Sequence, residues 1–233
     1  MKNLLTVAFT LSLLMLTLTV TKAQECFGMP IKEGGGYEMT SLNAKGKPQG
    51  TIKYRFTSVK KEGDYTVVDI EMESVSTKGK TELTQKFTIK CNGNEYVVDA
   101  ASFVAQEQLK SLESFNMTFK SDDVVYPNQL SEGQTLKDAS LTGTGDMNGI
   151  PVSFDMKMTD RKVVGRERIK VGAGEYDAFK ITTNSKMTTK TVISVNIDFE
   201  TVSYRAPGVI WDIKTETYRK GKLLGSTELS KIY

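Results

Sequence analysis

Histidine is absent from the 233-residue sequence, and only two cysteines are present. Ser-His-Asp and Cys-His catalysis both need an imidazole base, so this absence excludes them together with imidazole metal ligands. Two cysteines are also too few for a four-cysteine zinc site. We therefore predict that the protein is not an enzyme and has no catalytic residue, no metal site and no cofactor. Composition leaves one enzymatic alternative open, a site that uses only Asp, Glu, Lys or Tyr.

An excess of charge of one sign is lacking as well. The chain has 31 basic and 28 acidic residues and a net charge of +3, to which Lys2 and Lys22 of the N-terminal segment contribute two. So small a net charge creates no long-range field that would attract nucleic acid, and we expect no nucleic-acid partner. Linkers rich in Pro and Ser are missing too. We therefore predict a single β-rich domain over residues 24–233.

The N-terminus has the three-part pattern of a secretory signal peptide. Lys2 supplies a positive start, residues 4–20 form an uncharged run, and Thr21 and Ala23 are the small residues of a cleavage site. A membrane span would need about 20 apolar residues, whereas this run is short and interrupted by threonines. We expect residues 1–23 to be a signal peptide that is cleaved after Ala23. No transmembrane segment should remain, so the mature protein should be exported and either soluble or peripheral.

The body of the chain has the period-two pattern of β-strands. Apolar and polar residues alternate in residues 52–56, 68–72, 87–91, 154–158 and 195–199. Such alternation places one set of side chains inward and the other in water, which favours an antiparallel sheet. Lys-Gly-Lys occurs at residues 45–47, 78–80 and 220–222, between strand-like runs. We interpret these triplets as hairpin tips rather than as a basic binding surface.

One segment has helical spacing instead. Ala105, Leu109, Leu112 and Phe115 recur at the period of an α-helix, and either Asp99 or Ser102 could cap its start. The fold class we predict is therefore mainly β: a single antiparallel, strongly curved sheet or partly open β-barrel with one α-helix packed against it. Leu109, Leu112 and Phe115 should rest on the concave face of the sheet. The strand residues expected beneath them, as ligand pocket or as plain core, are Phe56, Ile70 and Phe87.

Cys26 and Cys91 have three interpretations: a lipid anchor at Cys26, a disulfide, or two free thiols. The residues before Cys26 are Ala23, Gln24 and Glu25, and a bulky amide and a charge stand where a lipidation signal needs small residues. Cys91 shares the inward face of its strand with Ile89, and an exported chain enters an oxidising compartment. We predict a Cys26–Cys91 disulfide. Its loop of about 65 residues should contribute about 4 kcal/mol on the chain-entropy model.

Four blocks resemble one family from Gram-negative bacteria. They are "ECFGMPIKEGGGYEMTSLNAKGKPQGTIKY", "LSEGQTLKDASL", "DRKVVGRERIKVGAGEYDAFKITT" and "APGVIWDIKTETYRKGKLLGSTELSKI". Together they are similar, in order, to secreted TapB-like proteins, whose domain has no known function. The resemblance implies a location in the periplasm or at the cell surface. It implies no catalytic residue.

Two functions remain in view. The first is a non-enzymatic binding module of the cell envelope for an apolar or peptide ligand. Methionines at positions 72, 117, 147, 156, 158 and 187 could line such a pocket, although filling the core is their usual role. The alternative is a structural or assembly partner at the envelope with no small-molecule ligand. A roomy apolar cavity would favour the first.

Overall fold

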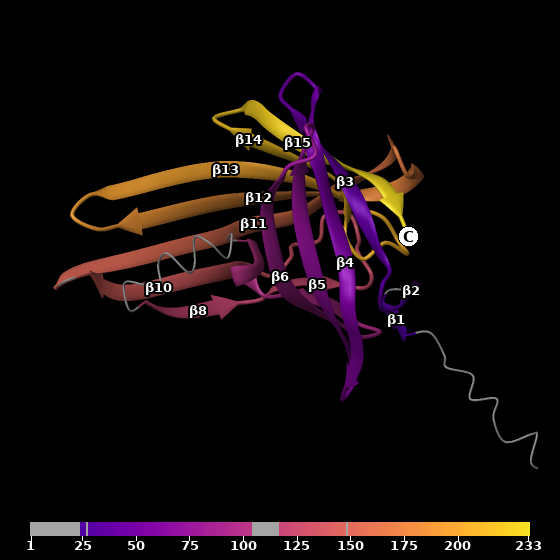
Figure 1. The fold of residues 1–233 in the computed structure, drawn as a ribbon, viewed down its shortest axis with the longest axis horizontal. Coiled ribbons are helices and arrows are strands. Elements are labelled where there is room, and N and C mark those ends of the chain that lie inside the picture. The colour runs from indigo at the N-terminus through magenta and orange to yellow at the C-terminus, as the bar shows by residue number, and fades with distance from the viewer. Residues whose placement is uncertain (1–23, 27, 104–116, 148) are drawn as a thin grey trace, which may run out of the picture.

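The computed structural model describes residues 24–26, 28–103, 117–147 and 149–233, which form a structure made almost entirely of β-strands (Figure 1). The strands are β1 (Gln24–Cys26), β2 (Met29–Ile31), β3 (Gly36–Asn43), β4 (Pro48–Glu62), β5 (Tyr65–Ser76), β6 (Thr81–Cys91), β7 (Glu95–Val98), β8 (Thr118–Asp122), β9 (Val124–Pro127), β10 (Ala139–Met147), β11 (Ile150–Val171), β12 (Gly174–Lys190), β13 (Ser194–Arg205), β14 (Asp212–Arg219) and β15 (Lys222–Ile232).

Thirteen of these strands form one sheet, in the order β8-β10-β11-β12-β13-β14-β15-β3-β4-β5-β6-β7-β9, and every pair is antiparallel. The two strands at the ends of this order, β8 and β9, are separated in sequence only by Asp123. One short segment therefore pairs with β10 through β8 and with β7 through β9. The two edges of the sheet meet at this segment. This nearly closed, barrel-like sheet confirms the predicted mainly β, antiparallel and strongly curved fold.

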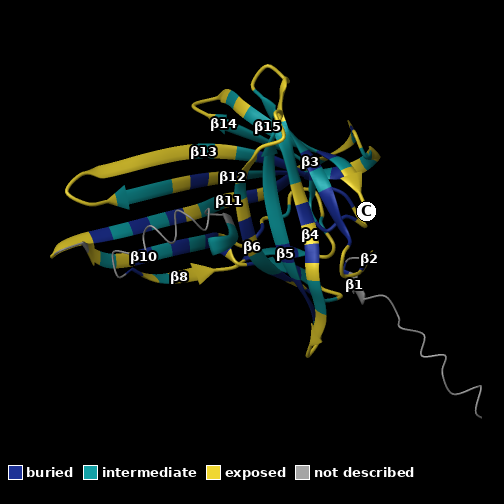
Figure 2. Ribbon diagram, in the orientation of Figure 1, coloured by how far each residue is buried: buried dark blue, intermediate teal, exposed yellow. Residues whose placement is uncertain are grey.

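The sheet has two halves that cross in Figure 1. We call β3–β7 the packed half and β10–β13 the long-strand half. In the long-strand half, β11 has 22 residues and β12 has 17, and their turns project well beyond the crossing. Burial is greatest where the halves cross and falls toward the projecting ends (Figure 2). Among the described residues, sheet curvature therefore creates an enclosed centre and an open end.

Cross-strand rows of inward side chains build the packed half. Phe56 on β4 stands opposite Ile70 on β5, which in turn stands opposite Phe87 on β6. Phe56 and Ile70 are buried in the core, and Phe87 is half-buried against it. Alternation on these strands thus puts apolar groups on the concave face, where they remove apolar area from water.

The same alternation does not bury the end of the long-strand half. Val195 and Ile197 on β13 were expected to face inward with Phe199, but they are 51% and 37% exposed. Both stand at the start of β13, and the start of this strand adjoins the turn that projects past the crossing strands (Figure 2). The expectation was wrong for these two residues because a period of two selects a face of the sheet, whereas burial requires another element over that face.

The Lys-Gly-Lys triplets are hairpin tips, as predicted. Gly46, Gly79 and Gly221 have φ angles of 70°, 77° and 72°, a left-handed conformation that glycine adopts without steric cost. Each connects two neighbouring strands of the sheet. Glycine at these tips therefore allows the tight turn. The lysines beside it indicate no shared binding site.

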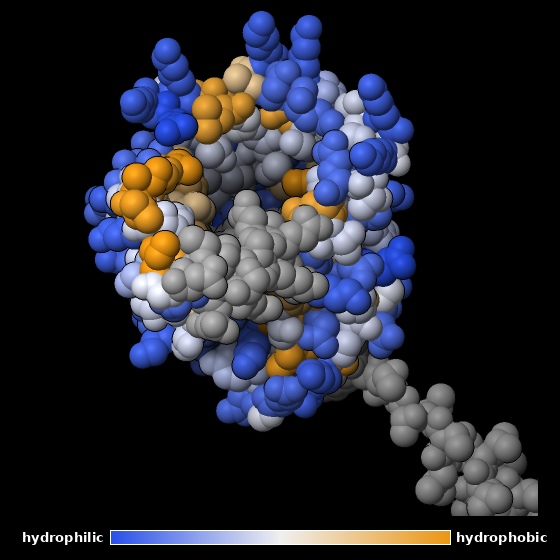
Figure 3. Space-filling model, turned by 60° about the vertical axis from the view of Figure 1, so that its left-hand side comes forward, coloured by the Kyte–Doolittle hydropathy of each residue, from blue (hydrophilic) through white to orange (hydrophobic). Residues whose placement is uncertain are grey.

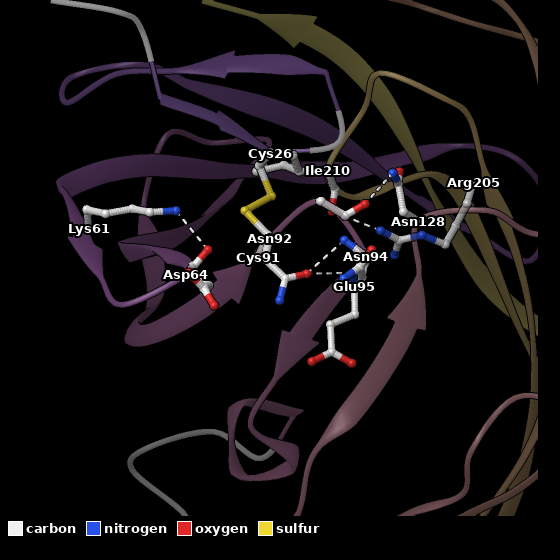
Figure 4. The surroundings of a disulfide bond; sticks show 11 residues. Cys26, Lys61, Asp64, Cys91, Asn92, Asn94, Glu95, Asn128, Arg205 and Ile210 are labelled. Carbon is white, nitrogen blue, oxygen red and sulfur yellow. Dashed lines mark hydrogen bonds between the residues drawn. A yellow bond between two sulfur atoms is a disulfide. The ribbon is translucent and has the colours of Figure 1, made fainter.

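The predicted disulfide is present and joins β1 to β6 at the edge of the packed half (Figure 4). Cys26 and Cys91 are both fully buried. The turn after Cys91 is held by Asn92, whose side-chain oxygen accepts hydrogen bonds from the backbone N–H groups of Asn94 and Glu95 at 2.8 and 2.9 Å. Because the Sγ atom of Cys26 is bonded to Cys91, it cannot at the same time form a thioether to a lipid.

Most of the predicted helix lies outside the described residues. Asp99 accepts a 2.9 Å hydrogen bond from the N–H of Ala101 at the start of η1 (Ala100–Phe103), which is a 3₁₀ turn. The residues carrying the stripe, Ala105, Leu109, Leu112 and Phe115, lie outside the described part of the chain, as does the predicted signal peptide at residues 1–23. Among the described residues there is no α-helix, and hence no helix able to span a membrane.

Candidate functional site

A cavity of about 280 Å³ lies on the inner face of the long-strand half. Its apolar wall is formed by Met156, Met158, Met187, Phe199 and Trp211. This volume is close to the lower end of the range for small-molecule sites, about 300–1,000 Å³. The cavity is thus large enough for a small or slender ligand.

Strand register explains why these side chains meet. Met156 and Met158 are two residues apart on β11 and therefore point to the same face. Met156 stands opposite Met187 on β12, and Ser185 of β12 stands between Met158 and Phe199 of β13. Three adjacent strands thereby present one continuous methionine-rich surface, which is adaptable in shape because methionine is flexible.

The wall changes character along β12. Met187 lies toward the projecting turn, whereas Thr183 lies four residues nearer the centre of the molecule, about 13 Å along the strand. Thr183 stands opposite Thr201, and Ser203 follows two residues later on β13. All three hydroxyl-bearing residues border the cavity. The methionines therefore lie toward the open end of the cavity, and these hydroxyl groups lie toward its base.

Trp211 connects the cavity to the aromatic core of the packed half. Its ring centroid lies 5.7 Å from that of Tyr54, 5.9 Å from Phe87 and 6.3 Å from Tyr37. Burial raises the pKa values of the Tyr37 and Tyr54 hydroxyls. These tyrosines therefore stay neutral and act as packing groups beside the base of the cavity.

A buried ion pair lies at this base. Nη1 of Arg205, at the end of β13, is 3.0 Å from Oδ1 of Asp212, at the start of β14, and Nη2 donates a 3.0 Å hydrogen bond to the carbonyl of Ile210. The Arg205 guanidinium also lies 4.1 Å from the ring centroid of Tyr126. Burial raises the pKa of the Asp212 carboxyl, and the nearby guanidinium groups of Arg205 and Arg161 oppose that rise. The carboxylate of Asp212 is thus already engaged by Arg205.

Arg161 is the second buried guanidinium and is only 1% exposed. It occupies a bulge in β11 between Thr159, paired with Asn184, and Lys162, paired with Thr182. Asp160 there has a φ of 53°, a left-handed conformation that aspartate tolerates better than most residues. The one extra residue of the bulge turns the Arg161 side chain inward at the level of the hydroxyl end of the cavity.

The hydrogen bonds of Arg161 are incomplete. Nη1 donates to the carbonyl of Lys137 and, at 3.4 Å, to that of Val125, and the guanidinium lies 4.7 Å from the Tyr126 ring centroid. Nη2 is buried and has no acceptor among the described residues, none of whose carboxylates forms a salt bridge with Arg161. An unsatisfied buried donor costs about 1–3 kcal/mol, and more when it is charged. With two guanidinium groups and one carboxylate, this cluster has a surplus of positive charge.

A larger hollow of about 660 Å³ lies elsewhere along β12–β14 and differs in character. Its walls include the exposed charged side chains of Lys186, Asp198 and Glu200. Exposed charges of both signs are well solvated and create no desolvated recognition site. Within the described residues, no cluster of three or more acidic or cysteine side chains could hold a metal ion. We therefore take the 280 Å³ cavity as the candidate site.

Of the helix and strand residues proposed from the sequence, the three that the structure describes do not belong to the wall of this cavity. Phe56, Ile70 and Phe87 belong to the packed half, and the ring of Phe87 lies 5.9 Å from that of Trp211, which lines the cavity. Leu109, Leu112 and Phe115 fall outside the described residues. Sequence reasoning included Met156, Met158 and Met187 among its candidate methionines but missed Arg161, Asp212 and Trp211. The only signals for these were the interrupted alternation at Asp160-Arg161 and the presence of a single tryptophan.

Two solved structures of bacterial proteins share the fold of this chain. A Bacteroides fragilis protein described as a "putative exported protein with YmcC-like fold" has a TM-score of 0.66 and 18% identity, over 90% of this chain and all of that one. A Parabacteroides distasonis protein described as a "putative lipoprotein" has a TM-score of 0.66 and 22% identity, with the same coverage. No curated protein sequence matches the chain. A family model described as DUF3108-like matches residues 32–229, so the chain belongs to the DUF3108-like family.

Proposed function

We propose that this protein is a non-enzymatic binding protein of the bacterial envelope that holds a small apolar ligand in the 280 Å³ cavity. The observation that carries the proposal is the wall of Met156, Met158, Met187, Phe199 and Trp211, which is apolar but not filled by neighbouring side chains. Apolar surfaces of this kind gain free energy when a ligand replaces water on them.

The open end of the molecule supports a route to this site. Figure 3 views the molecule from the end where the long strands project and shows it hollowed there, with apolar side chains on the rim. The large exposed apolar residues include Val192 and Ile193 in the turn between β12 and β13. A ligand that is itself apolar would meet apolar side chains first on this path.

The cellular location of the protein is part of the same proposal. Both similar structures are described as exported or lipoprotein chains, which supports export of this protein. We place it in the periplasm or at the cell surface of a Gram-negative bacterium. The likeness to TapB-like proteins stays a prediction. Native mass spectrometry of protein purified from its own host would identify any ligand that it carries.

Trp211 supplies a direct assay, because it borders the cavity and is the only tryptophan in the chain. We expect the apolar dye N-phenyl-1-naphthylamine to quench its emission in a saturable manner. Thr183→Phe would fill the cavity and should weaken dye binding at least tenfold. Thr188→Phe, on the outward face of the same strand, is the matched control and should leave binding unchanged.

A structural or assembly role is the second candidate, favoured by the exposed turn at Val192 and Ile193, which are 81% and 71% exposed. Exposed apolar groups of this size can serve as contacts for another protein. The dye titration separates the two roles. A complete lack of saturable quenching, or equal effects of the two phenylalanine variants, would count against the binding role.

A further inference from the structure

The buried guanidinium of Arg161 includes a hydrogen-bond donor for which the described residues provide no acceptor. Its guanidinium borders the cavity, is 1% exposed, and leaves Nη2 without a hydrogen-bond partner in the described part of the chain. The neighbouring carboxylate, Asp212, is held 3.0 Å from Arg205 instead. A group that brings an anionic oxygen to the cavity base would complete the hydrogen bonding of Arg161.

The gradient along the cavity wall gives this ligand a direction. Met156 and Met187 line the part nearer the open end, the hydroxyls of Thr183 and Thr201 come next, and Arg161 lies level with them. A molecule with an apolar chain and one anionic head would match this order with its head innermost. The volume of about 280 Å³ suits one chain better than two.

From these observations we infer that the ligand is a single-chain amphipathic carboxylate whose head is bound by Arg161. This inference rests on the proposed function, since it names the class of ligand for the same cavity. Arg161 acts by binding: its Nη2 has no acceptor among the described residues, and a carboxylate oxygen placed there would accept a charge-assisted hydrogen bond. No bond is made or broken.

The experiment compares dodecanoate with dodecan-1-ol, which share chain length and differ in the head group. Both are titrated against the wild-type protein below their aggregation limits, with Trp211 emission and displacement of N-phenyl-1-naphthylamine as readouts. We expect dodecanoate to bind at least tenfold more tightly than the alcohol. Arg161→Gln should abolish that preference by weakening dodecanoate binding and leaving binding of the alcohol unchanged.

Arg166→Gln is the matched control, because Arg166 is an exposed arginine on the same strand, and it should keep the full preference. Arg161→Lys serves if Arg161→Gln does not fold, and it should retain only part of the preference. Equal binding of acid and alcohol to the wild type would overturn the inference and leave the proposed function standing. Binding of neither would overturn both. A preference that persists in the Arg161 variants would remove Arg161 from its assigned role.

Discussion

Met39 on β3 and Met156 on β11 are almost equally buried, at 1% and 2% exposure, yet they belong to differently built regions. Met39 lies in the packed half, where β4 and β15 flank its strand. Met156 lies in the long-strand half and borders the cavity. Both residues therefore have low solvent exposure. This value alone does not tell a residue in a filled interior from one in the wall of a cavity.

The same contrast appears along single strands. Val68 and Ile70 on β5 are 0% and 1% exposed, whereas Val195 and Ile197 on β13 are 51% and 37% exposed. Both pairs are apolar residues two positions apart, so the local sequence pattern predicts the same inward orientation for them. The difference teaches that burial depends on whether another element covers the face: β5 is covered, whereas the start of β13 leaves apolar surface available for other contacts.

The largest effect should come from removing the covalent link that closes the packed half. Replacement of Cys26 and Cys91 together by alanine should lower the free energy of unfolding by about 4 kcal/mol, because the unfolded chain then regains the freedom of a 65-residue loop. Urea denaturation followed by circular dichroism would measure the loss. A change below about 1 kcal/mol would show that the packed half does not depend on this link.

A paired truncation would sharpen the comparison between the two methionines. Met39→Ala should cost about 3 kcal/mol, a typical value for a buried methionine. Met156→Ala should cost clearly less, because a side chain that already borders a hollow gives up fewer packing contacts. The measurement is the difference between the two urea midpoints at equal slope. Equal losses would mean that Met156 packs as tightly as Met39.

The smallest effect is expected at the projecting turn. Ile193→Ser should change the free energy of unfolding by less than about 0.5 kcal/mol, since Ile193 is 71% exposed. Thermal unfolding alongside the wild type would test this. A substantial loss of stability would indicate that this turn is covered in solution, and the contrast between the halves would then weaken.

Much of the fold could be predicted from local pattern. Alternation in residues 52–56, 68–72 and 87–91 indicated strands, and the glycines of the Lys-Gly-Lys triplets marked their turns. The Cys26–Cys91 bridge followed from there being only two cysteines in a chain expected to be exported. These features are readable because strand period, turn conformation and cysteine pairing depend on a few residues at a time.

The candidate site was much less predictable. The sequence patterns assigned no role to Arg161, Arg205 or Trp211. What brings them together is the closure of a 13-stranded sheet around Tyr126, through pairing of β9 with β7 and of β8 with β10. Such contacts join residues far apart in the chain, and no local spacing records them.

By itself, the sequence determined the strands, the faces on which their apolar residues lie, the disulfide and the absence of histidine chemistry. Tertiary structure alone decided which apolar face is covered, where a cavity remains, and that the Arg161 guanidinium is buried at its base. The physical reason is that alternation fixes the direction of a side chain relative to its own strand. Burial depends instead on what the curvature of the whole sheet places on the other side.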